Sequence, residues 1–272
     1  MTPDDLQHAT CYPSAQQGRE DAILCLETPQ TLSPTYKLAF DDTDFLVRDD
    51  MRGVRLQLEM MKPEVELQPN NIHSTIVVFG SARAADPVQD PDGPLAKYYG
   101  EARKFAALAS AASQSDKLRD YVVLTGDGPG IMEAVNRGAD DVHAKSIGLN
   151  ITLPHEQHPN AYVTPELCFQ FHYFAIRKMH FLMRARAMVA FPGGFGTMDE
   201  LFEALTLIQT KKITPIPILV FGMDYWRKII NFEAMVDAGV ISAEDLNLFT
   251  YVETAESAWN TIRDYYGWPD IY

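Results

Sequence analysis

The strongest constraint on how this chain folds is the stretch 191–200, which reads FPGGFGTMDE. An apolar run at 187–191 leads into it and predicts a buried strand, and apolar residues at helical spacing follow in 201–208. The glycines between these elements allow a sharp turn and a close approach of the backbone to a ligand. A strand, a glycine turn and a helix N-terminus form an anion site, because free N–H groups and the helix dipole point to one place. The glycines are Gly193, Gly194 and Gly196.

Two hypotheses for Glu200 follow from this stretch. Thr197 stands where a helix N-cap belongs and Glu200 comes three residues later, which is the spacing of a capping box. In that case both side chains only satisfy backbone N–H groups. Alternatively, the Glu200 carboxylate lies one turn into a helix whose N-terminus binds a phosphate, within reach of an attached sugar. There it stabilises a developing cation and orients water.

Two other apolar strands are also followed by glycine turns. The strand 75–79 precedes Gly80 and Ser81, and the strand 121–124 precedes the turn 126–130. One such turn alone most often only reverses the chain. The carboxyl ends of parallel strands meet at one edge of a sheet, however, so the three turns converge on one crevice. The second turn adds Gly126, Gly128 and Gly130 to the candidate ligand-binding residues.

The chain from 71 to 272 alternates between short apolar strands and helical patterns. Such alternation predicts a parallel sheet covered by helices on both faces, and thus one α/β, Rossmann-like, doubly wound domain. The expected strands are 75–79, 121–124, 145–151, 167–171, 187–191 and 216–221. The expected helices are 95–113, one that runs onward from 131–135, 173–186, one that leads out of the motif to about 211, 224–238 and 254–266.

Residues 1–70 form an N-terminal extension with a different character. The first 45 residues are rich in Pro, Gln, Thr and Asp and have weak periodicity, as expected for a disordered leader or for an arm laid over the core or a partner subunit. A helical pattern follows at 44–61. Pro63 and Pro69 are expected to end that helix.

The charge balance restricts the class of ligand. The chain of 272 residues has 23 Lys and Arg against 37 Asp and Glu, a net charge of −14. Nucleic acids and anionic membranes would be repelled, because their binding depends on basic patches. A small phosphate ligand needs only local positive potential, so a monomeric nucleotide is compatible with this surface.

Other patterns indicate what the chain lacks. The N-terminus shows no signal peptide, and no apolar run reaches the roughly 18–20 residues that span a bilayer, so we expect a soluble cytoplasmic protein. The cysteines are odd in number and widely spaced, and the histidines show no H-E-x-x-H spacing, so we expect neither a disulfide framework nor a metal site. These residues are Cys11, Cys25, Cys168, His155, His158, His172 and His180.

The motif Pro-Gly-Gly-x-Gly-Thr-x-x-Glu, at 192–200, resembles the signature of the LOG (Lonely Guy) family, long mislabelled lysine decarboxylases. Members are Rossmann-like phosphoribohydrolases that release the base from nucleoside 5′-monophosphates. The resemblance covers roughly residues 72–225 and is strongest from 167 to 212. The first turn also matches the family's Gly-Ser. The second resembles its Gly-Gly-Gly-x-x-Gly-x-Met turn, except that Asp127 stands where many members have glycine.

The resemblance implies which residues carry the chemistry. Glu200 corresponds to the final glutamate of the motif, the catalytic carboxylate of the family, which favours the catalytic hypothesis over the capping box. Arg177 corresponds to the second catalytic residue in the family's Arg-Lys-x-x-Met helix, although here Met179 follows Lys178 directly. The guanidinium would hold phosphate or ribose oxygens or steady Glu200.

The resemblance also implies a binding surface made of the three turns and their neighbours. Water is the nucleophile in this chemistry, so no cofactor is expected. The predicted substrate and phosphate contacts are Gly80, Ser81, Gly126, Gly128, Gly130, Met132, Lys178, Gly193, Gly194, Phe195, Gly196 and Thr197. Further candidates are Arg83, Arg184 and Arg186 for the phosphate and Glu133 and Asn136 for the base.

Partners and alternatives complete the expectations. Family members are usually homodimers or larger homo-oligomers, and the substrate could be AMP or an N6-prenylated AMP that yields a cytokinin. A non-catalytic nucleotide-binding or molybdenum-cofactor-binding protein of the same fold is the alternative. Lysine decarboxylation would need pyridoxal phosphate on a Schiff-base lysine, and nothing marks Lys178 as such a residue.

Overall fold

The computed structural model describes residues 12–23, 26–115, 118–153 and 158–268. The chain divides into two compact units, Met1–Leu58 and Glu59–Tyr272, which we describe separately. The domain division predicted at residue 70 stays a prediction. None of the helices in the described ranges combines the length and apolar character that crossing a bilayer requires.

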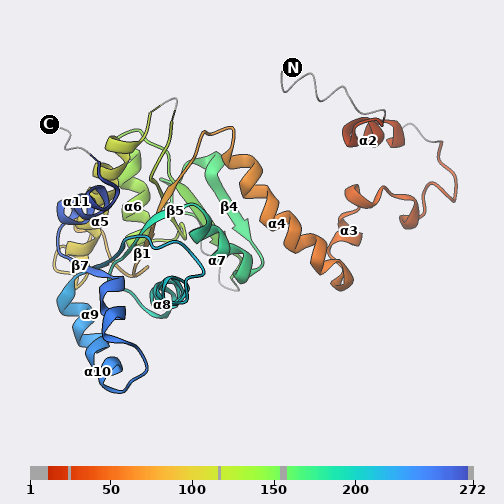
Figure 1. Ribbon diagram of the computed structural model, residues 1–272. Helices are drawn as coiled ribbons and strands as arrows, with labels where there is room; N and C mark the ends of the chain where they lie inside the picture. Colours follow the sequence, from red (N-terminus) through yellow and green to blue (C-terminus); the bar gives the residue numbers. More distant parts are fainter. Residues whose placement is uncertain (1–11, 24–25, 116–117, 154–157, 269–272) are drawn as a thin grey trace. The chain divides into compact units, whose positions relative to one another are not determined.

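The first unit consists of short helices. It contains α2 (Ala15–Ile23), α3 (Thr43–Leu46) and the beginning of α4 (Arg52–Leu67), besides short 3₁₀ turns (Figure 1). The prediction of one helix over 44–61 is wrong at both ends. Asp42 caps α3 by accepting a hydrogen bond from the Phe45 N–H at 3.2 Å, and α3 ends four residues later, before α4 begins.

Helix α4 continues through Pro63 to Leu67, although we expected this proline to end it. Proline has no N–H to donate to the carbonyl four residues earlier, so the Glu59 carbonyl loses its helical partner. The Nε2 atom of His180 lies 3.1 Å from that oxygen. Because a carbonyl can only accept, His180 Nε2 must donate. The lost helical bond is thereby replaced by a tertiary one.

The second unit is built on a sheet of seven strands in the order β4-β3-β2-β1-β5-β6-β7, with every neighbouring pair parallel. This confirms the predicted α/β class. The sequence did not reveal the edge strand β7, which is only three residues long. The strands are β1 (Thr75–Phe79), β2 (Val122–Thr125), β3 (Ile147–Ile151), β4 (Cys168–Phe171), β5 (Ala185–Ala190), β6 (Ile218–Phe221) and β7 (Thr250–Val252).

Helices cover both faces of this sheet (Figure 1). Alternate residues of β1 enter separate cores: Ile76 packs with residues of the helices on one face, and Val77 with those on the other. All five residues of β1 are buried, as expected for a strand covered on both sides. One face carries α5 (Ala96–Ser113), α6 (Ile131–Asp140) and α11 (Ala255–Tyr266). The other carries α7 (Phe174–Met183), α8 (Phe195–Gln209), α9 (Met223–Ile229) and α10 (Phe232–Asp237).

Two helix boundaries differ from the prediction. Helix α7 ends at Met183, three residues before the expected end, because β5 already begins at Ala185. The single helix expected over 224–238 is two helices, α9 and α10. Asn231 separates them, and its side chain accepts a hydrogen bond from the Ala234 N–H at 2.9 Å to cap α10.

The order of the strands locates a crevice. Strand β1 lies between β2 and β5, so the chain winds outward in one direction from β1 to β4 and in the other from β5 to β7. Open α/β sheets bind ligands at such a switch point, outside the carboxyl ends of the strands. The three glycine turns follow β1, β2 and β5 and therefore lie at this edge.

The contact between α5 and α6 depends on Gly138. A Cβ atom there would lie 2.1 Å from the Arg103 carbonyl oxygen and 2.9 Å from Ala106 Cβ. We predict that Gly138→Ala lowers the free energy of unfolding by about 1–3 kcal/mol, because the two helices must move apart. Gly100→Ala, in open space on α5, should raise it by about 0.5–1 kcal/mol. Urea unfolding measures both, and equal effects of the two substitutions would contradict this packing.

Candidate active site

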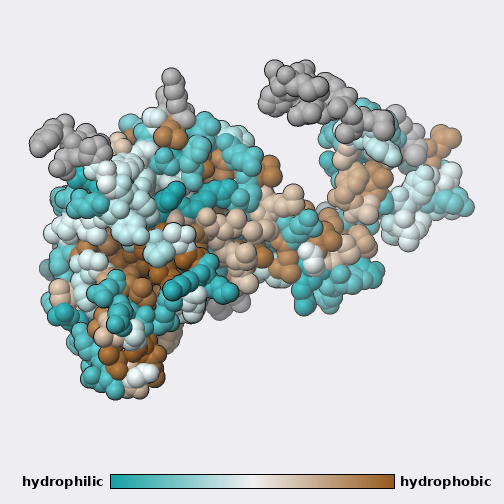
Figure 2. Space-filling model, in the orientation of Figure 1, coloured by the Kyte–Doolittle hydropathy of each residue, from teal (hydrophilic) through white to brown (hydrophobic). Residues whose placement is uncertain are grey.

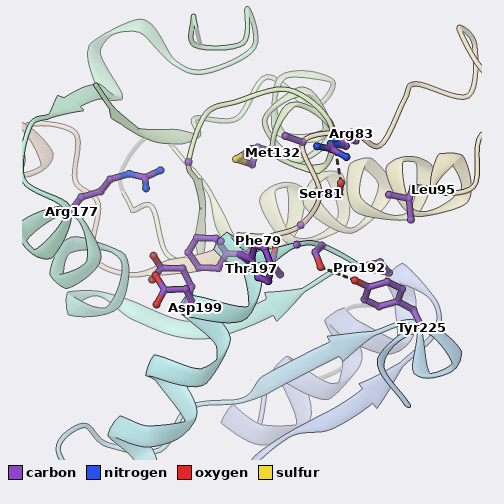
Figure 3. A pocket seen from close by; sticks show the side chains of 18 of the residues that line it. Phe79, Ser81, Arg83, Leu95, Met132, Arg177, Pro192, Thr197, Asp199 and Tyr225 are labelled. Carbon is purple, nitrogen blue, oxygen red and sulfur yellow. Dashed lines mark hydrogen bonds between the residues drawn. The ribbon is translucent and has the colours of Figure 1, made fainter. Parts of the chain in front are cut away.

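A cavity of about 640 Å³ lies at the carboxyl ends of β1, β2 and β5 (Figure 3). All three glycine turns contribute to its wall. Gly80, Ser81 and Arg83 come from the first turn, and Gly126 and Met132 from the second turn and its helix. Residues 193–197 and Glu200 come from the third turn and α8, and Arg177 comes from α7. The structure thus brings most of the predicted ligand-binding residues to one place.

Three predicted contacts are absent from the lining of this cavity: Gly128, Gly130 and Lys178. Gly130 has a φ of +72°, and a Cβ there would lie 2.4 Å from the Ser81 carbonyl oxygen. The next residue, Ile131, donates its N–H to that same oxygen at 3.1 Å. Gly130 therefore holds the first turn against the second. Gly128 is buried and its carbonyl accepts a hydrogen bond from the Asn160 side chain.

The third turn leads directly into α8. This helix begins at Phe195 with Gly194 as its N-cap, so Thr197 lies inside the first turn and the capping-box hypothesis is wrong. The Thr197 hydroxyl occupies the space beside Gly193, where a Cβ would lie 2.1 Å from its oxygen. The helix therefore starts two residues before the threonine, and its first N–H groups have no acceptor within the helix.

Other contacts hold the third turn in place. The Ser81 N–H donates to the Pro192 carbonyl at 3.0 Å, which joins the first turn to the third. The Tyr225 hydroxyl donates to the Gly193 carbonyl at 2.7 Å (Figure 3). Two peptide carbonyls of this turn are thereby engaged by other residues of the cavity wall.

Glu200 is a buried carboxyl group on the cavity wall. The residue is only 4% exposed, and burial raises the pKa of its carboxyl group to about 7, although Lys178 partly opposes this shift. Lys178 Nζ lies 3.6 Å from a Glu200 oxygen, 2.6 Å from Asp199 and 3.0 Å from Glu203. The Lys178 ammonium therefore balances the carboxylates of α8, and the cavity wall does not include it.

Arg177 reaches the cavity from α7 along a tightly packed path. Its Nε donates to the carbonyl of Leu149, the middle residue of β3, at 2.7 Å. A Cβ at Gly126 would lie 2.6 Å from Nη2 and 3.1 Å from Met132 Sδ, so the glycine leaves the space that the guanidinium occupies. Burial lowers the pKa of Arg177 from its usual value, while the carboxylates of Glu200 and Asp127 raise it. Figure 3 shows the guanidinium extending into the site.

Asp127, the departure from the family's glycine turn, is buried outside the cavity wall. Its φ of +56° is one that favours glycine. Asn150 Nδ2 donates to its carboxylate at 2.5 Å, and burial raises the pKa of Asp127 to about 6. The side chain fits because the neighbouring strand has Gly148, where a Cβ would lie 2.6 Å from Asp127 Cβ.

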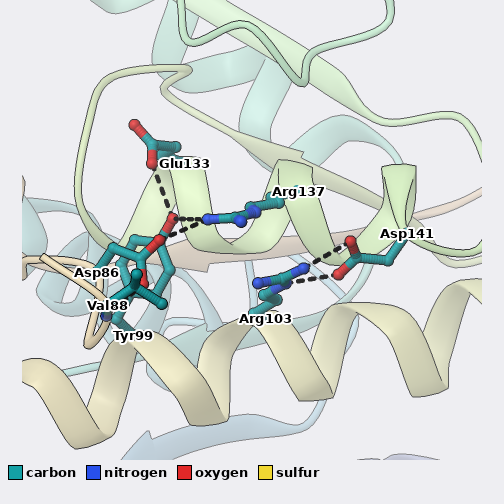
Figure 4. A network of polar contacts seen from close by, with 7 residues as sticks. All are labelled: Asp86, Val88, Tyr99, Arg103, Glu133, Arg137 and Asp141. Atoms are coloured by element: carbon teal, nitrogen blue, oxygen red, sulfur yellow. Dashed lines mark hydrogen bonds and ion pairs between the residues drawn. The ribbon is translucent and has the colours of Figure 1, made fainter.

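The two candidates for base recognition on α6 besides Met132 face other residues. Glu133 accepts a hydrogen bond from the Tyr99 hydroxyl at 2.8 Å, and Asn136 accepts one from the Thr125 hydroxyl at 2.8 Å. Figure 4 shows Glu133 within a network that joins α5, α6 and the loop after β1. In that network Arg137 pairs with Asp86 at 2.6 Å. Glu133 and Asn136 therefore support the site from behind.

The remaining sequence candidates are divided. Arg83 lines the cavity, whereas Arg184 pairs with Glu64 and Arg186 lies beside Tyr266. Sequence reasoning did not find three lining residues, Leu95, Phe174 and Tyr225. They lie far apart in the chain and belong to no motif, so only the fold could bring them together.

The described residues contain no candidate metal site. Within the part of the chain that the structure describes, no three His, Cys, Asp or Glu residues lie close enough to hold a metal ion. His155, Cys11 and Cys25 lie outside the described residues. Cys168 is a free thiol whose pKa is raised to about 11 by burial and by Asp127.

The fold is that of a Rossmann-like α/β protein whose cavity lies at the switch point of the sheet, beside the N-terminus of α8. A family model described as "Possible lysine decarboxylase" matches residues 132–262. Two curated rice (Oryza sativa subsp. japonica) proteins are similar to the chain, and both are named probable cytokinin riboside 5′-monophosphate phosphoribohydrolases. These matches support the resemblance of the motif at 192–200 to the LOG family.

The rice relatives are distant. LOGL3 is 28% identical over 96 residues, which cover 35% of this chain and 45% of that protein. LOG4 is 26% identical over 188 residues, which cover 67% of this chain and 80% of that protein. The chain therefore matches less than half of the length of LOGL3 and most of the length of LOG4.

Solved structures with a similar fold have TM-scores below 0.5. One is the protein TM1055, with a TM-score of 0.47 and 18% identity over 70% of this chain and 99% of that one. Another is a molybdenum cofactor binding protein of Rippkaea orientalis, with a TM-score of 0.47 and 16% identity over 72% and 98%.

The buried Glu200 makes the stability of the protein depend on pH. Its pKa of about 7 lies above the usual 4.5, so the folded state binds the proton more tightly than the unfolded state. Protonated Glu200 therefore contributes about 3 kcal/mol to the free energy of unfolding below pH 4.5, and this contribution is lost as the pH rises through 7. We predict that Glu200→Gln is more stable than wild type at pH 8 and differs little near pH 4.5.

Thermal unfolding at the two pH values measures this difference. Glu203→Gln, on the next turn of α8 and outside the cavity wall, is the matched control. Coinciding melting curves of wild type and Glu200→Gln at pH 8 would contradict the burial of an ionisable carboxyl group at position 200.

Proposed function

We propose that this protein hydrolyses the N-glycosidic bond of a purine nucleoside 5′-monophosphate to the free base and ribose 5-phosphate. The observation that carries the proposal is that Glu200 and Arg177 line the same cavity as the glycine turn at the start of α8. The names of the rice relatives, both probable phosphoribohydrolases, support the same class of reaction.

The phosphate would bind at the beginning of α8. The N–H groups of residues 195–197 have no acceptor inside the helix, and the helix dipole adds positive potential at this end. Arg83 lines the same cavity and adds a formal positive charge. An anchored phosphate would fix the sugar and bring its anomeric carbon toward Glu200 and Arg177.

The reaction needs only water as a second reactant. The bond between C1′ and the base nitrogen breaks, its electron pair leaves with the base, and positive charge develops on the ribose. The ionised Glu200 stabilises that charge and accepts a proton from the water that attacks C1′. This proton then passes to the departing base, which leaves as the neutral free base, and the carboxylate is restored. Arg177 holds ribose or phosphate oxygens, and its fixed position beside Gly126 limits the reorganisation that binding requires.

A binding protein without catalysis is the alternative class, whether for nucleotides or for molybdenum cofactor. A carboxylate beside a phosphate site repels an anionic ligand, and burying one costs stability. A site that only binds has no use for such a group, whereas a reaction with a cationic transition state does. The buried Glu200 therefore favours hydrolysis.

Lysine decarboxylation with pyridoxal phosphate fits the residues poorly. A Schiff base needs a lysine in the cavity, and none lines it. Lys178 is the lysine nearest in sequence to the site, and its ammonium contacts three carboxylates of α8.

The substrate could extend to N6-prenylated AMP, as the names of the relatives suggest. Met132, Phe174 and Phe195 offer apolar surface in the cavity wall, with Phe195 93% exposed.

We also propose that the protein forms a homodimer or larger homo-oligomer. Helix α7 exposes Phe174, Met179 and Met183, and Figure 2 shows apolar surface in the region of α7 and α8.

The direct test is release of base from AMP, GMP, CMP and N6-prenyl-AMP, followed by chromatography. We expect adenine from AMP, and a loss of at least about 100-fold in kcat for Glu200→Ala, because the developing cation loses its partner. Calorimetry should show that this variant still binds AMP. Glu203→Ala, which removes a carboxylate of the same helix outside the cavity, should keep most of the activity. Undiminished turnover by Glu200→Ala would refute the assignment.

The pH dependence of turnover tests the same carboxyl group. Because Glu200 acts in its ionised form and its pKa is raised to about 7, kcat/KM for AMP should fall as the pH is lowered from 8 to 6. Initial rates in buffers of constant ionic strength measure this profile. A profile flat down to pH 5 would contradict a catalytic carboxylate with this pKa.

A further inference from the structure

Helix α7 carries Arg177, yet little of it is buried. Of its ten residues only His180 and Phe181 are buried, while Phe174, Met179 and Met183 are exposed. Apolar packing holds this helix through Phe181, whose ring meets that of Phe79 at 4.8 Å, and through the half-buried Ile176 and Leu182. Polar contacts along the helix add to this packing in setting the position of its backbone.

Those contacts come from the last part of α4, in particular from Glu59. Its carboxylate accepts hydrogen bonds from the N–H groups of His172 at 2.8 Å and Tyr173 at 3.1 Å, directly before α7 begins. A carboxylate at this end of a helix also interacts favourably with the helix dipole. Helix α7 has no capping side chain of its own, so its N-terminus is capped from another helix.

The same turn of α4 contacts α7 at two further points. The Glu59 carbonyl, freed by Pro63, accepts a hydrogen bond from His180 Nε2 at 3.1 Å, and His180 is only 5% exposed. Glu64 pairs with Arg184, at the other end of α7, with an Nη2 to Oε2 distance of 2.7 Å. The segment 59–64 therefore holds α7 at its start, its middle and its end.

The position of α7 decides where Arg177 lies. The Arg177 N–H donates to the Tyr173 carbonyl at 3.2 Å. Tyr173, whose own N–H donates to Glu59, therefore begins the helical turn that carries Arg177. At the other end of the side chain, Nη2 packs against Gly126 and Nε bonds to Leu149. The Arg177 side chain is held at the backbone by α7 and at the guanidinium by Leu149 and Gly126. A shift of the α7 backbone would therefore strain or move the guanidinium.

We propose that Glu59 is a positioning residue for Arg177, acting through the N-terminus of α7. It lies outside the residues that the family model matches. The segment beginning at Glu59 thus belongs functionally to the α/β unit. The expected effect on turnover rests on the function proposed above, whereas the effect on the backbone of α7 does not.

The activity test is a double-mutant cycle. Glu59→Ala is made in the wild-type and Arg177→Lys backgrounds, with Glu66→Ala, an exposed glutamate on the same helix, as the matched control. In the wild-type background, Glu59→Ala should lower kcat for AMP by about 10-fold to 100-fold with a smaller change in KM. In the Arg177→Lys background it should have little further effect. Glu59→Gln, which keeps one acceptor oxygen, should recover part of the rate.

The outcomes separate positioning from general stability. An equal fold-loss in both backgrounds, or a loss that matches the unfolded fraction seen in thermal melts, would show a structural role alone and overturn the proposal. Undiminished kcat in Glu59→Ala would overturn it as well.

Amide hydrogen exchange tests the proposal without turnover. Exchange at residues 172–177 should be faster in Glu59→Ala than in wild type or Glu66→Ala, and exchange in α8 should stay unchanged. Unchanged exchange at 172–177 would overturn the proposal. If wild type releases no base from any nucleotide, the proposed function fails, and this exchange measurement still decides the role of Glu59.

Discussion

The reversal of strand order between β1 and β5 is the constraint on which the site depends. Because the chain winds away from this point in both directions, the turns after β1 and β5 lie side by side with no helix between them. A hydrogen bond from Ser81 to the Pro192 carbonyl joins the two turns. The cavity, the start of α8 and Glu200 all take their places from this junction.

Close packing at the glycine turns leaves little room for side chains at three positions. Gly126 leaves room for the Arg177 guanidinium, Gly193 for the Thr197 hydroxyl, and Gly130 for the Ser81 carbonyl. In each case a Cβ would overlap an atom of the site or of its supporting turn. The pair of Asp127 and Gly148 shows the opposite solution, in which a side chain within a glycine turn is accommodated by a glycine in the next strand.

The site contains a buried carboxyl group within a protein whose net charge is strongly negative. Glu200 lies near Asp199 and Glu203 on a chain with a net charge of −14, and Lys178 is the cation that offsets these three carboxylates. The raised pKa of Glu200 is the energetic consequence of burial. Such a group reduces stability near neutral pH, and in the proposed reaction it stabilises charge that exists only in the transition state.

The sequence alone determined the parallel α/β sheet and the three glycine turns, because apolar periodicity and glycine turns are local signals. The choice of Arg177 and Glu200 as candidate catalytic residues came from the resemblance of their motifs to the LOG family. Only the tertiary structure decided that Thr197 lies within α8, that Lys178 faces carboxylates, and that α4 continues through Pro63. It also brought Glu59 to the start of α7 and Tyr225 to the third turn. These outcomes depend on contacts between residues far apart in the chain: the Glu59 carbonyl, for example, finds in His180 the donor that Pro63 cannot supply.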